Sequence, residues 1–468
     1  MLISKTKTIF FLLLLLIAHT IFAQNVLWTK IYNRNYDEYG AGVAVDGTNY
    51  IVVGTYFVNN GEFLIIKYNN NGDTVWTRRY TIGNDDWAMA VAVDATHNII
   101  VVGNSEKQDS TILVLRKISS TGSLTWTKTL RMAKRTAAEG VTLDNSGNIY
   151  VVGSIDMELD FDLLLIKYNS SGDTVWTRTF SSPFDDYGTQ VAVDGNANIL
   201  VSGFFGVTDV NDFLTMKYTP QGDTLWARFY DSGQDDFANV VKVDNSNNVI
   251  VGGGSGDLDS HRYRLIKYTS NGNQVWTRHL NSALNDDIYG CALDSRGDIV
   301  VTGSSGNISN YDYLTVKYTR NGDTVWSRRY HRDYDDNAMD IAIDGSANLV
   351  VTGFTFNGTD YDVVTIKYSN TVGFEENDNY NIQPSEFQIQ NCNFVKNNLG
   401  LNINVNSPDW FDISLYDISG KKIMSIYSGR LGVGKHNFNN LILNSGVYFL
   451  RIKSFNNQLI CKKIVSVK

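Results

Sequence analysis

The stretch Asp85–Lys128 reads DDWAMAVAVDATHNIIVVGNSEKQDSTILVLRKISSTGSLTWTK and contains four short apolar runs. The runs lie around Val91–Val93, Ile99–Val102, Ile112–Ile118 and Leu124–Lys128. Asp, Asn, Ser and Gly separate them, and these residues favour tight turns because they tolerate positive φ or bond to their own backbone. The pattern therefore predicts an antiparallel sheet of four strands.

The same unit recurs along the chain. Each unit is marked by one tryptophan, and successive tryptophans are 48 residues apart once and 50 residues apart five times. These are Trp28, Trp76, Trp126, Trp176, Trp226, Trp276 and Trp326. Small residues such as Ala88, Ala90 and Ala92 alternate along the first strand, as expected where several sheets converge on one axis. Radial repetition of four-stranded units predicts an all-β fold, a seven-bladed β-propeller.

The two ends of the repeat region complement each other. The last unit has runs at Ile341–Ile343, Leu349–Val351 and Val363–Tyr368 but no tryptophan strand after them. The first unit is preceded by an additional tryptophan strand, Val26–Ile31. A solenoid would instead need atypical capping repeats at its open ends. We therefore expect residues 24–370 to form a closed ring, with the N-terminal strand completing the last blade.

Residues 1–23 have the features of a secretory signal peptide. Lys5 and Lys7 supply the positive end, and the run Ile9–Ala18 is apolar. Ala23 then offers a small residue at the cleavage point. The apolar run is well short of the ~20 residues that a membrane helix needs, which disfavours a membrane anchor. The sequence thus predicts a secreted or outer-membrane cell-surface protein without a transmembrane segment.

Composition excludes several classes of function. The chain is 43% hydrophobic, which excludes wholesale disorder. Its net charge is -9, and loss of the two leader lysines makes it -11, so a nucleic-acid partner is disfavoured. Three cysteines are too few for a disulfide scaffold, and the six histidines form no ligand-spaced pair. We expect neither a metal nor another cofactor.

The composition changes after Tyr368. Residues 371–385 are polar and acidic and are predicted to be a linker, and residues 386–468 form a separate unit. About seven strand-like runs in this unit suggest a small immunoglobulin-like β-sandwich. The runs are Phe387–Ile389, Leu401–Val405, Phe411–Tyr416, Lys422–Tyr427, Gly434–Asn437, Gly446–Lys453 and Leu459–Val467. Cys392 and Cys461 both lie here, and the sequence leaves open whether they pair.

Two resemblances follow from these motifs. The repeat, with its Asp-Asp-aromatic, Val-Ala-Val-Asp, Ile-Val-Val-x-Gly, Lys-Tyr and Gly-Asp-Thr-Val-Trp-Thr-Arg elements, resembles the bacterial β-propeller repeat family of extracellular proteins. That family has no single activity, so the resemblance implies a fold and no function. The elements Leu415–Lys422, Gly446–Ile452 and Lys462–Lys468 resemble the type A sorting domain of the Bacteroidetes type IX secretion system.

The second resemblance implies a partner and an address. Sorting domains of this type are recognised by the outer-membrane translocon and usually cleaved, leaving cargo released or attached at the surface. The residues of this chain that carry the signal would be Gly446, Tyr448, Arg451, Lys462, Lys463 and Val467. The alternative is an ordinary immunoglobulin-like binding module, which the leader and the terminal position of the domain disfavour.

Charged residues repeat with the blades. A lysine lies nine residues before each tryptophan from Trp76 to Trp326, and Lys367 lies nine residues before the position where the next tryptophan is missing. Acidic pairs such as Asp85/Asp86 and Asp185/Asp186 begin most first strands. Because one active site is not built seven times, we interpret these charges as ion pairs that hold strands and blades together. The alternative is a ring of carboxylates that collects cations or a basic ligand.

The third blade departs from the acidic ring. Arg135 and Thr136 stand there in place of the acids, at the end of the basic run Arg131–Arg135, between Asp85/Asp86 of the second blade and Asp185/Asp186 of the fourth. We predict a ligand-binding notch at Lys134, Arg135 and these four aspartates, on the end of the propeller where the connections from fourth to first and from second to third strands emerge. Other departures are Gln190, Lys242 and Asp340 on first strands and His261 and His331 in loops.

No catalytic motif is present in the sequence. It has no Gly-x-Ser-x-Gly elbow, phosphate loop, His-Glu-x-x-His helix or spaced calcium loop. The leading interpretation is a secreted or surface binding scaffold for an unknown protein or glycan. The competing class is an extracellular carbohydrate-active enzyme, a glycosidase or polysaccharide lyase with its site on the same loop face. Near-uniform loop lengths favour binding, because an enzyme cleft usually needs a long insertion.

Overall fold

The computed structural model describes residues 26–157, 160–207, 210–256, 261–280, 285–307 and 310–369, and then 387–395, 398–406, 408–417, 422–443, 446–454 and 459–466. These residues divide into two compact units, of which Val26–Ser369 is the larger. The expected signal peptide, the linker 371–385 and Val467 lie outside the described residues. None of the described segments forms a helix long and apolar enough to cross a membrane.

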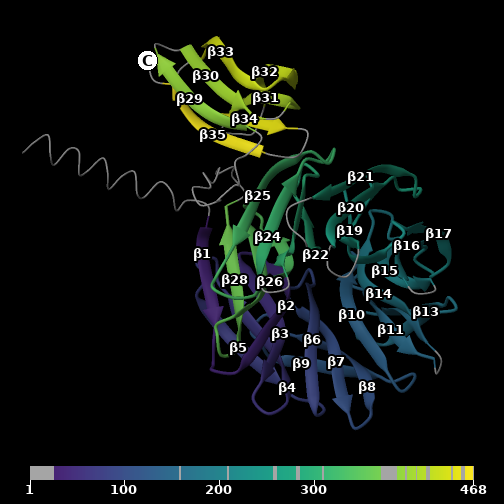
Figure 1. The fold of residues 1–468 in the computed structure, drawn as a ribbon. Helices are drawn as coiled ribbons and strands as arrows, with labels where there is room; N and C mark the ends of the chain where they lie inside the picture. Colours follow the sequence, from purple (N-terminus) through teal and green to yellow (C-terminus); the bar gives the residue numbers. More distant parts are fainter. Residues whose placement is uncertain are drawn as a thin grey trace, which may run out of the picture. The chain divides into compact units, whose positions relative to one another are not determined.

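The larger unit consists of seven four-stranded antiparallel sheets, as predicted (Figure 1). We name the strands of a blade A to D from the axis outward. Blades one to three are β2(Asp37–Asp46), β3(Asn49–Phe57), β4(Gly61–Tyr68), β5(Thr74–Tyr80); β6(Asp85–Val93), β7(Ile99–Lys107), β8(Ser110–Ile118), β9(Leu124–Leu130); and β10(Thr136–Leu143), β11(Ile149–Asp156), β12(Phe161–Tyr168), β13(Thr174–Phe180).

The remaining four blades repeat the order. They are β14(Asp186–Val193), β15(Ile199–Val207), β16(Val210–Tyr218), β17(Thr224–Tyr230); β18(Asp235–Val243), β19(Val249–Gly256), β20(Arg262–Tyr268), β21(Gln274–Leu280); β22(Asn285–Leu293), β23(Ile299–Asn307), β24(Asn310–Tyr318), β25(Thr324–Tyr330); and β26(Asp336–Ile343), β27(Leu349–Phe356), β28(Tyr361–Tyr368), β1(Val26–Tyr32).

Ring closure by the N-terminal strand is confirmed. Strand β1 pairs antiparallel with β28, and Trp28 lies opposite Lys367. The indole Nε1 of Trp28 also donates to the carbonyl of Asn70, in the first blade, at 3.0 Å. The strand therefore completes the last sheet and also joins the last blade to the first.

Every strand A carries a β-bulge, and the neighbouring strand B has a glycine opposite the bulge. In the second blade the register shifts between Ala88 and Ala90, opposite Gly103 and Val102. A Cβ on Gly103 would lie 1.9 Å from the carbonyl oxygen of Trp87, so no side chain fits there. The Gly of the Ile-Val-Val-x-Gly element is thus required by the close approach of the bulged strand.

The apolar core lies between neighbouring blades. One cluster joins Tyr150, Leu163 and Leu165 of the third blade to Val191 and Leu214 of the fourth, and all five side chains are buried. Each blade packs between two similar blades, which buries the sheet faces that lie between them.

The repeated bases do not face the acidic pairs that begin strand A, so that part of the ion-pair interpretation is wrong. Six of the seven lysines instead pair with the aspartate that ends strand A of their own blade, as in Lys217–Asp194 at 2.8 Å, whereas Lys167 donates to the carbonyl of Pro220 at 3.1 Å. Matching pairs are Lys67–Asp46, Lys117–Asp94, Lys267–Asp244, Lys317–Asp294 and Lys367–Asp344. The strands are antiparallel, which places these bases at the opposite end of the blade.

The C-terminal unit is a two-sheet sandwich, as predicted. One sheet contains β29(Phe387–Val395), β30(Asn398–Val405) and β33(Gly434–Ile442). The other contains β32(Lys422–Leu431), β31(Asp409–Asp417), β34(Gly446–Ser454) and β35(Leu459–Ser466). Leu401 and Ile403 of the first sheet pack against Phe411, Ile413 and Ile452 of the second. The side chains of Cys392 and Cys461 lie outside the described part of the structure.

Candidate ligand-binding face

The second carboxylate of each acidic pair supports the loop before its own strand A. Asp86 is fully buried and accepts from the amide of Ile82 at 2.6 Å. Glu38, Asp186, Asp236 and Asp336 accept from Arg34, Ser182, Ser232 and Arg332 in the same way. Burial raises the pKa of Asp186 to about 6 and that of Glu38 to about 8. These carboxylates are structural loop caps rather than surface groups.

The first carboxylate of each pair fastens one blade to the preceding blade. Asp85 accepts from the amide of Gly61 at 2.7 Å, and Asp185 accepts from the amide of Phe161 at 2.9 Å. Asp37, Asp235, Asn285 and Asp335 accept from Tyr361, Asn211, His261 and Tyr311. These acidic residues therefore hold neighbouring blades together, but through backbone amides rather than through the predicted ion pairs.

The third blade closes the same junction without a carboxylate. The amide of Thr111 donates to the backbone carbonyl of Lys134 at 3.1 Å, and Thr136 Oγ1 accepts from the amide of Met132 at 3.0 Å. The side chains of Lys134 and Arg135 are released from this role and are exposed. At the predicted notch, the side chains of these two cationic residues therefore take no part in the hydrogen bonds that close the junction.

The six predicted site residues occupy three successive blade junctions. Arg135 and Asp185 lie close enough to Tyr187 to act on it: Asp185 adds to the burial that raises the pKa of Tyr187 to about 12, and Arg135 opposes it. Asp185 is exposed and Asp85 is partly exposed, whereas Asp86 and Asp186 are fully buried. Among the described residues, no hydrogen bond or ion pair joins Asp85 or Asp86 to Lys134 or Arg135.

A track of aromatic rings follows the same face and was not singled out from the sequence. Tyr187 and Phe237 stand directly after the acidic pairs, on strands A of the fourth and fifth blades. Their rings are linked through Phe204, with centroid distances of 5.1 and 4.9 Å. Phe161 extends the track at one end, 5.4 Å from Tyr187, and His261 at the other, 5.7 Å from Phe237. All five rings are partly exposed.

A second group of rings lies at the junction of the seventh and first blades. Tyr39 contacts Phe354 and Tyr361 at centroid distances of 5.1 and 5.0 Å. Trp87 stands at the equivalent place in the second blade, and the Asp-Asp-aromatic element of the repeat is the sequence signal for all these rings. Aromatic rings at the mouth of a propeller offer flat apolar area for a ligand.

The two histidines belong to different arrangements. His261 contacts Asp287 at 3.4 Å through Nδ1, and this hydrogen bond raises its pKa, whereas Nε2 is shielded from solvent. His331 is exposed and contacts Asp312 at 2.7 Å. Arg329 also binds Asp312, at 3.0 Å.

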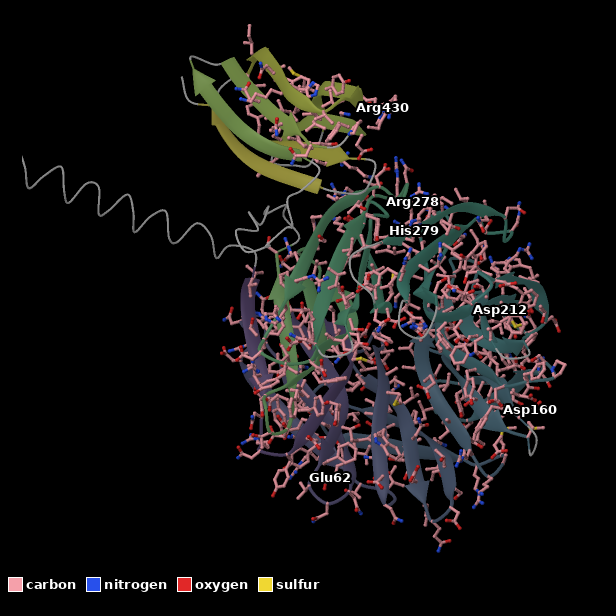
Figure 2. All side chains as sticks on the ribbon, viewed as in Figure 1. Glu62, Asp160, Asp212, Arg278, His279 and Arg430 are labelled. Carbon is pink, nitrogen blue, oxygen red and sulfur yellow. The ribbon has the colours of Figure 1, made fainter. Side chains whose placement is uncertain are left out.

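A hollow of about 360 Å³ lies at the seventh–first junction and is lined by Tyr32, Arg34, Tyr56, Thr77 and Arg79. The Arg79 guanidinium lies over the Tyr56 ring at 4.4 Å and contacts Glu62 at 3.5 Å. Glu62 is labelled in Figure 2. The hollow is cationic and aromatic, but it does not contain any of the predicted site residues.

Five of the six predicted signal residues lie on one strand pair of the C-terminal unit, and Val467 lies outside the described residues. Gly446 lies opposite Ser466, and Lys462 and Lys463 of β35 lie opposite Leu450 and Phe449 of β34. Arg451 places its guanidinium over the Tyr416 ring at 5.0 Å.

Comparison with known proteins supports the two units separately. Residues 394–468 match the family of secretion system C-terminal sorting domains. No curated protein matches the chain in sequence. The chain thus combines a seven-bladed β-propeller with a C-terminal segment that is similar to secretion system sorting domains.

Several solved structures are similar at low identity. Polysaccharide lyase Uly1 is 8% identical with a TM-score of 0.47, over 74% of this chain and 99% of that one. Sqt1 from Chaetomium thermophilum is 11% identical with a TM-score of 0.44, over 72% and 87%. A PL25 ulvan lyase bound to a saccharide is 12% identical with a TM-score of 0.44, over 74% and 94%. Likeness at this level says nothing about activity.

Proposed function

We propose that the protein is an extracellular binding scaffold whose propeller holds a glycan on the D–A and B–C loop face, and that its C-terminal domain directs export through the type IX secretion system. The proposed binding role rests on the aromatic track, in which partly exposed rings follow one another with centroid distances of 4.9–5.7 Å. The track contains Phe161, Tyr187, Phe204, Phe237 and His261 in this order. Ligand sites on rigid scaffolds combine such apolar area with a few polar groups.

The chemistry of the track fits a sugar chain. The apolar face of a pyranose ring packs on an aromatic ring, and its hydroxyls and acidic substituents need charged or hydrogen-bonding partners. Lys134 and Arg135 supply exposed cations and Asp185 an exposed carboxylate beside Tyr187. These three residues and the track form the proposed site, while Asp85, Asp86 and Asp186 support its loops.

A carbohydrate-active enzyme is the second candidate, and the two histidine–carboxylate contacts favour it. Such pairs can transfer protons when the second ring nitrogen reaches the substrate. His261 Nε2 is shielded, however, whereas His331 is exposed but lies beside Arg329 and Asp312 rather than on the aromatic track. Binding without turnover is therefore the better supported function.

The test is a glycan and protein array probed with the secreted protein, followed by turnover measurements on every hit. Tyr187→Ala and Phe237→Ala should each weaken glycan binding about 10-fold, whereas Phe229→Ala, an exposed ring on strand D, should not. Hits on proteins alone, or equal binding by all three variants, would refute the glycan site. Product formation on a hit would establish the enzyme instead.

The export half is tested by deleting residues 386–468. We expect the propeller to fold, because each of its described strands pairs with another strand of the propeller, but to be retained in the periplasm on cell fractionation. Appending residues 371–468 to a periplasmic reporter is the matched gain of function. Normal surface delivery of the truncated protein would show that the domain is not the address.

A further inference from the structure

We propose that Asp212, Asp231 and Asp236 form a binding site for one divalent cation of the calcium class at the junction of the fourth and fifth blades. One carboxylate oxygen of each lies within 4.8 Å of those of the other two. Two oxygens that share a calcium ion at 2.3–2.6 Å can be at most about 5 Å apart, so this spacing suits a common ion. Asp212 is labelled in Figure 2.

Asp212 is the residue that points to a ligand. It is 7% exposed, and its Oδ1 has no hydrogen-bond partner among the described residues. A buried carboxylate beside two others is costly unless a proton or a cation is shared between them.

The other two carboxylates leave room for an ion. Asp236 accepts from the amide and hydroxyl of Ser232 at 2.7 and 3.0 Å, and Asp231 accepts from the amide of Gly233 at 2.5 Å. Each carboxylate oxygen has a second lone pair for a metal. Asp231 is exposed, which provides a route for the ion. Arg264 also acts on Asp236, but its guanidinium lies over the Tyr230 ring at 5.1 Å.

The equivalent junction between the sixth and seventh blades shows how the protein neutralises this position without an ion. Asp312 occupies the place of Asp212 there, and it is bound by Arg329 at 3.0 Å and by His331 at 2.7 Å. The fourth blade has Phe229 in place of Arg329 and Asp231 in place of His331. The fourth blade thus lacks both cations that neutralise Asp312 and has an additional carboxylate instead. A cation from solvent would neutralise the negative charge there.

Calorimetric titration of the chelator-treated secreted protein with calcium chloride tests the site. We expect a Kd of about 10⁻⁴–10⁻³ M, as in extracellular calcium modules, and a rise in Tm of about 1–3 °C at saturating calcium. Asp231→Asn, at an exposed position, and Asp212→Asn should each weaken binding about 10-fold or more. Asp312→Asn is the matched control and should bind calcium as the parent does.

Phe229→Arg places at this junction the cation found at Arg329. It should abolish the calcium-dependent rise in Tm while raising the Tm measured in chelator. The proposal is overturned if the parent binds no calcium at about 10 mM, which would leave a shared proton as the neutralising group. It is equally overturned if both Asp212→Asn and Asp231→Asn bind calcium normally, or if Asp312→Asn alone loses it.

Discussion

The amide of Val43 in the first blade donates to the carboxylate of Asp340 in the seventh blade across 2.9 Å, joining residues 297 positions apart. Gln190 makes the matching bond inside the ring, where its Oε1 accepts from the amide of Val241 at 3.1 Å. Burial raises the pKa of Asp340, and the positive charge of Lys242 opposes this rise. Asp340 and Gln190 therefore each hold two neighbouring blades together through a backbone amide, and Lys242 acts on Asp340 through its charge.

Ring closure predicts a large stability loss when β1 is removed. Deleting residues 24–32 exposes the edge of β28 and removes Trp28 from its cluster with Tyr50, Leu64 and Ile66, so Tm should fall sharply. Trp28→Ala alone should cost about 2 kcal/mol by chemical denaturation. Leu27→Ala, at a residue 49% exposed, is the control. An unchanged Tm in the deletion would contradict closure.

Removing the lysine of a buried ion pair should lower the free energy of unfolding more than removing the lysine of an exposed pair. The side chains of Lys217 and Asp194 are 5% and 0% exposed, so Lys217→Met leaves a buried charge unpaired and should cost about 3 kcal/mol. Lys128 pairs with Asp173 at the surface, and Lys128→Met should cost less than about 1 kcal/mol. Urea unfolding of both variants measures the difference. Equal costs would mean that the lysines pack along tryptophan without any need of the ion pair.

Raised carboxyl pKa values predict that stability increases as the pH falls from 8 to about 5. Burial raises the pKa of Glu139 to about 7 and that of Glu38 to about 8, so the folded state holds protons that the unfolded chain has released. This contribution is fully present below the unfolded pKa of ~4.5 and is lost as the pH rises through the folded pKa. His279, whose pKa is lowered, acts in the opposite sense.

The pH effect is measured as Tm at four pH values between 5 and 8. Glu139→Gln should flatten the profile and stabilise the protein by about 1–3 kcal/mol at pH 8. Glu106→Gln, at an exposed position on β7, should leave the profile unchanged. A Tm that rises with pH in the parent, or an identical slope in Glu139→Gln, would show that burial of Glu139 does not control this dependence.

The fold was predictable because its determinants are periodic. Tryptophans 50 residues apart, turn residues between apolar runs and the missing last strand specify seven blades and their closure. The partners of the charges were not predictable in the same way. Asp85 bonds to the backbone amide of Gly61 and Asp86 to that of Ile82, and every residue except proline carries such an amide. The sequence therefore shows the acidic pair but does not show that one carboxylate joins two blades and the other supports a loop.

The aromatic track was missed for a related reason. Tyr187 and Phe237 belong to the Asp-Asp-aromatic element, and an element that recurs around the ring gives no sign of a role at one particular site. The link between them is Phe204, on strand B, which pairs opposite Tyr187 in the register. This pairing places the two rings side by side on neighbouring strands. The register of the sheet shows the pairing, whereas the order of residues in the sequence does not.

The notch at the third blade should tolerate a reversed charge at Arg135. Arg135→Asp restores the pattern of the other blades and supplies a carboxylate that can accept from the amide of Thr111, as Asp85 does from Gly61. Folding and Tm should therefore be unchanged or slightly improved.

Glycan binding should fall about 10-fold in Arg135→Asp if the ligand carries an acidic group, because a cation beside Tyr187 becomes an anion next to Asp185. Arg131→Asp reverses another exposed cation in the same loop and is the charge-matched control. Equal binding by the parent and both variants would separate the notch from the ligand site and leave the aromatic track alone to account for recognition.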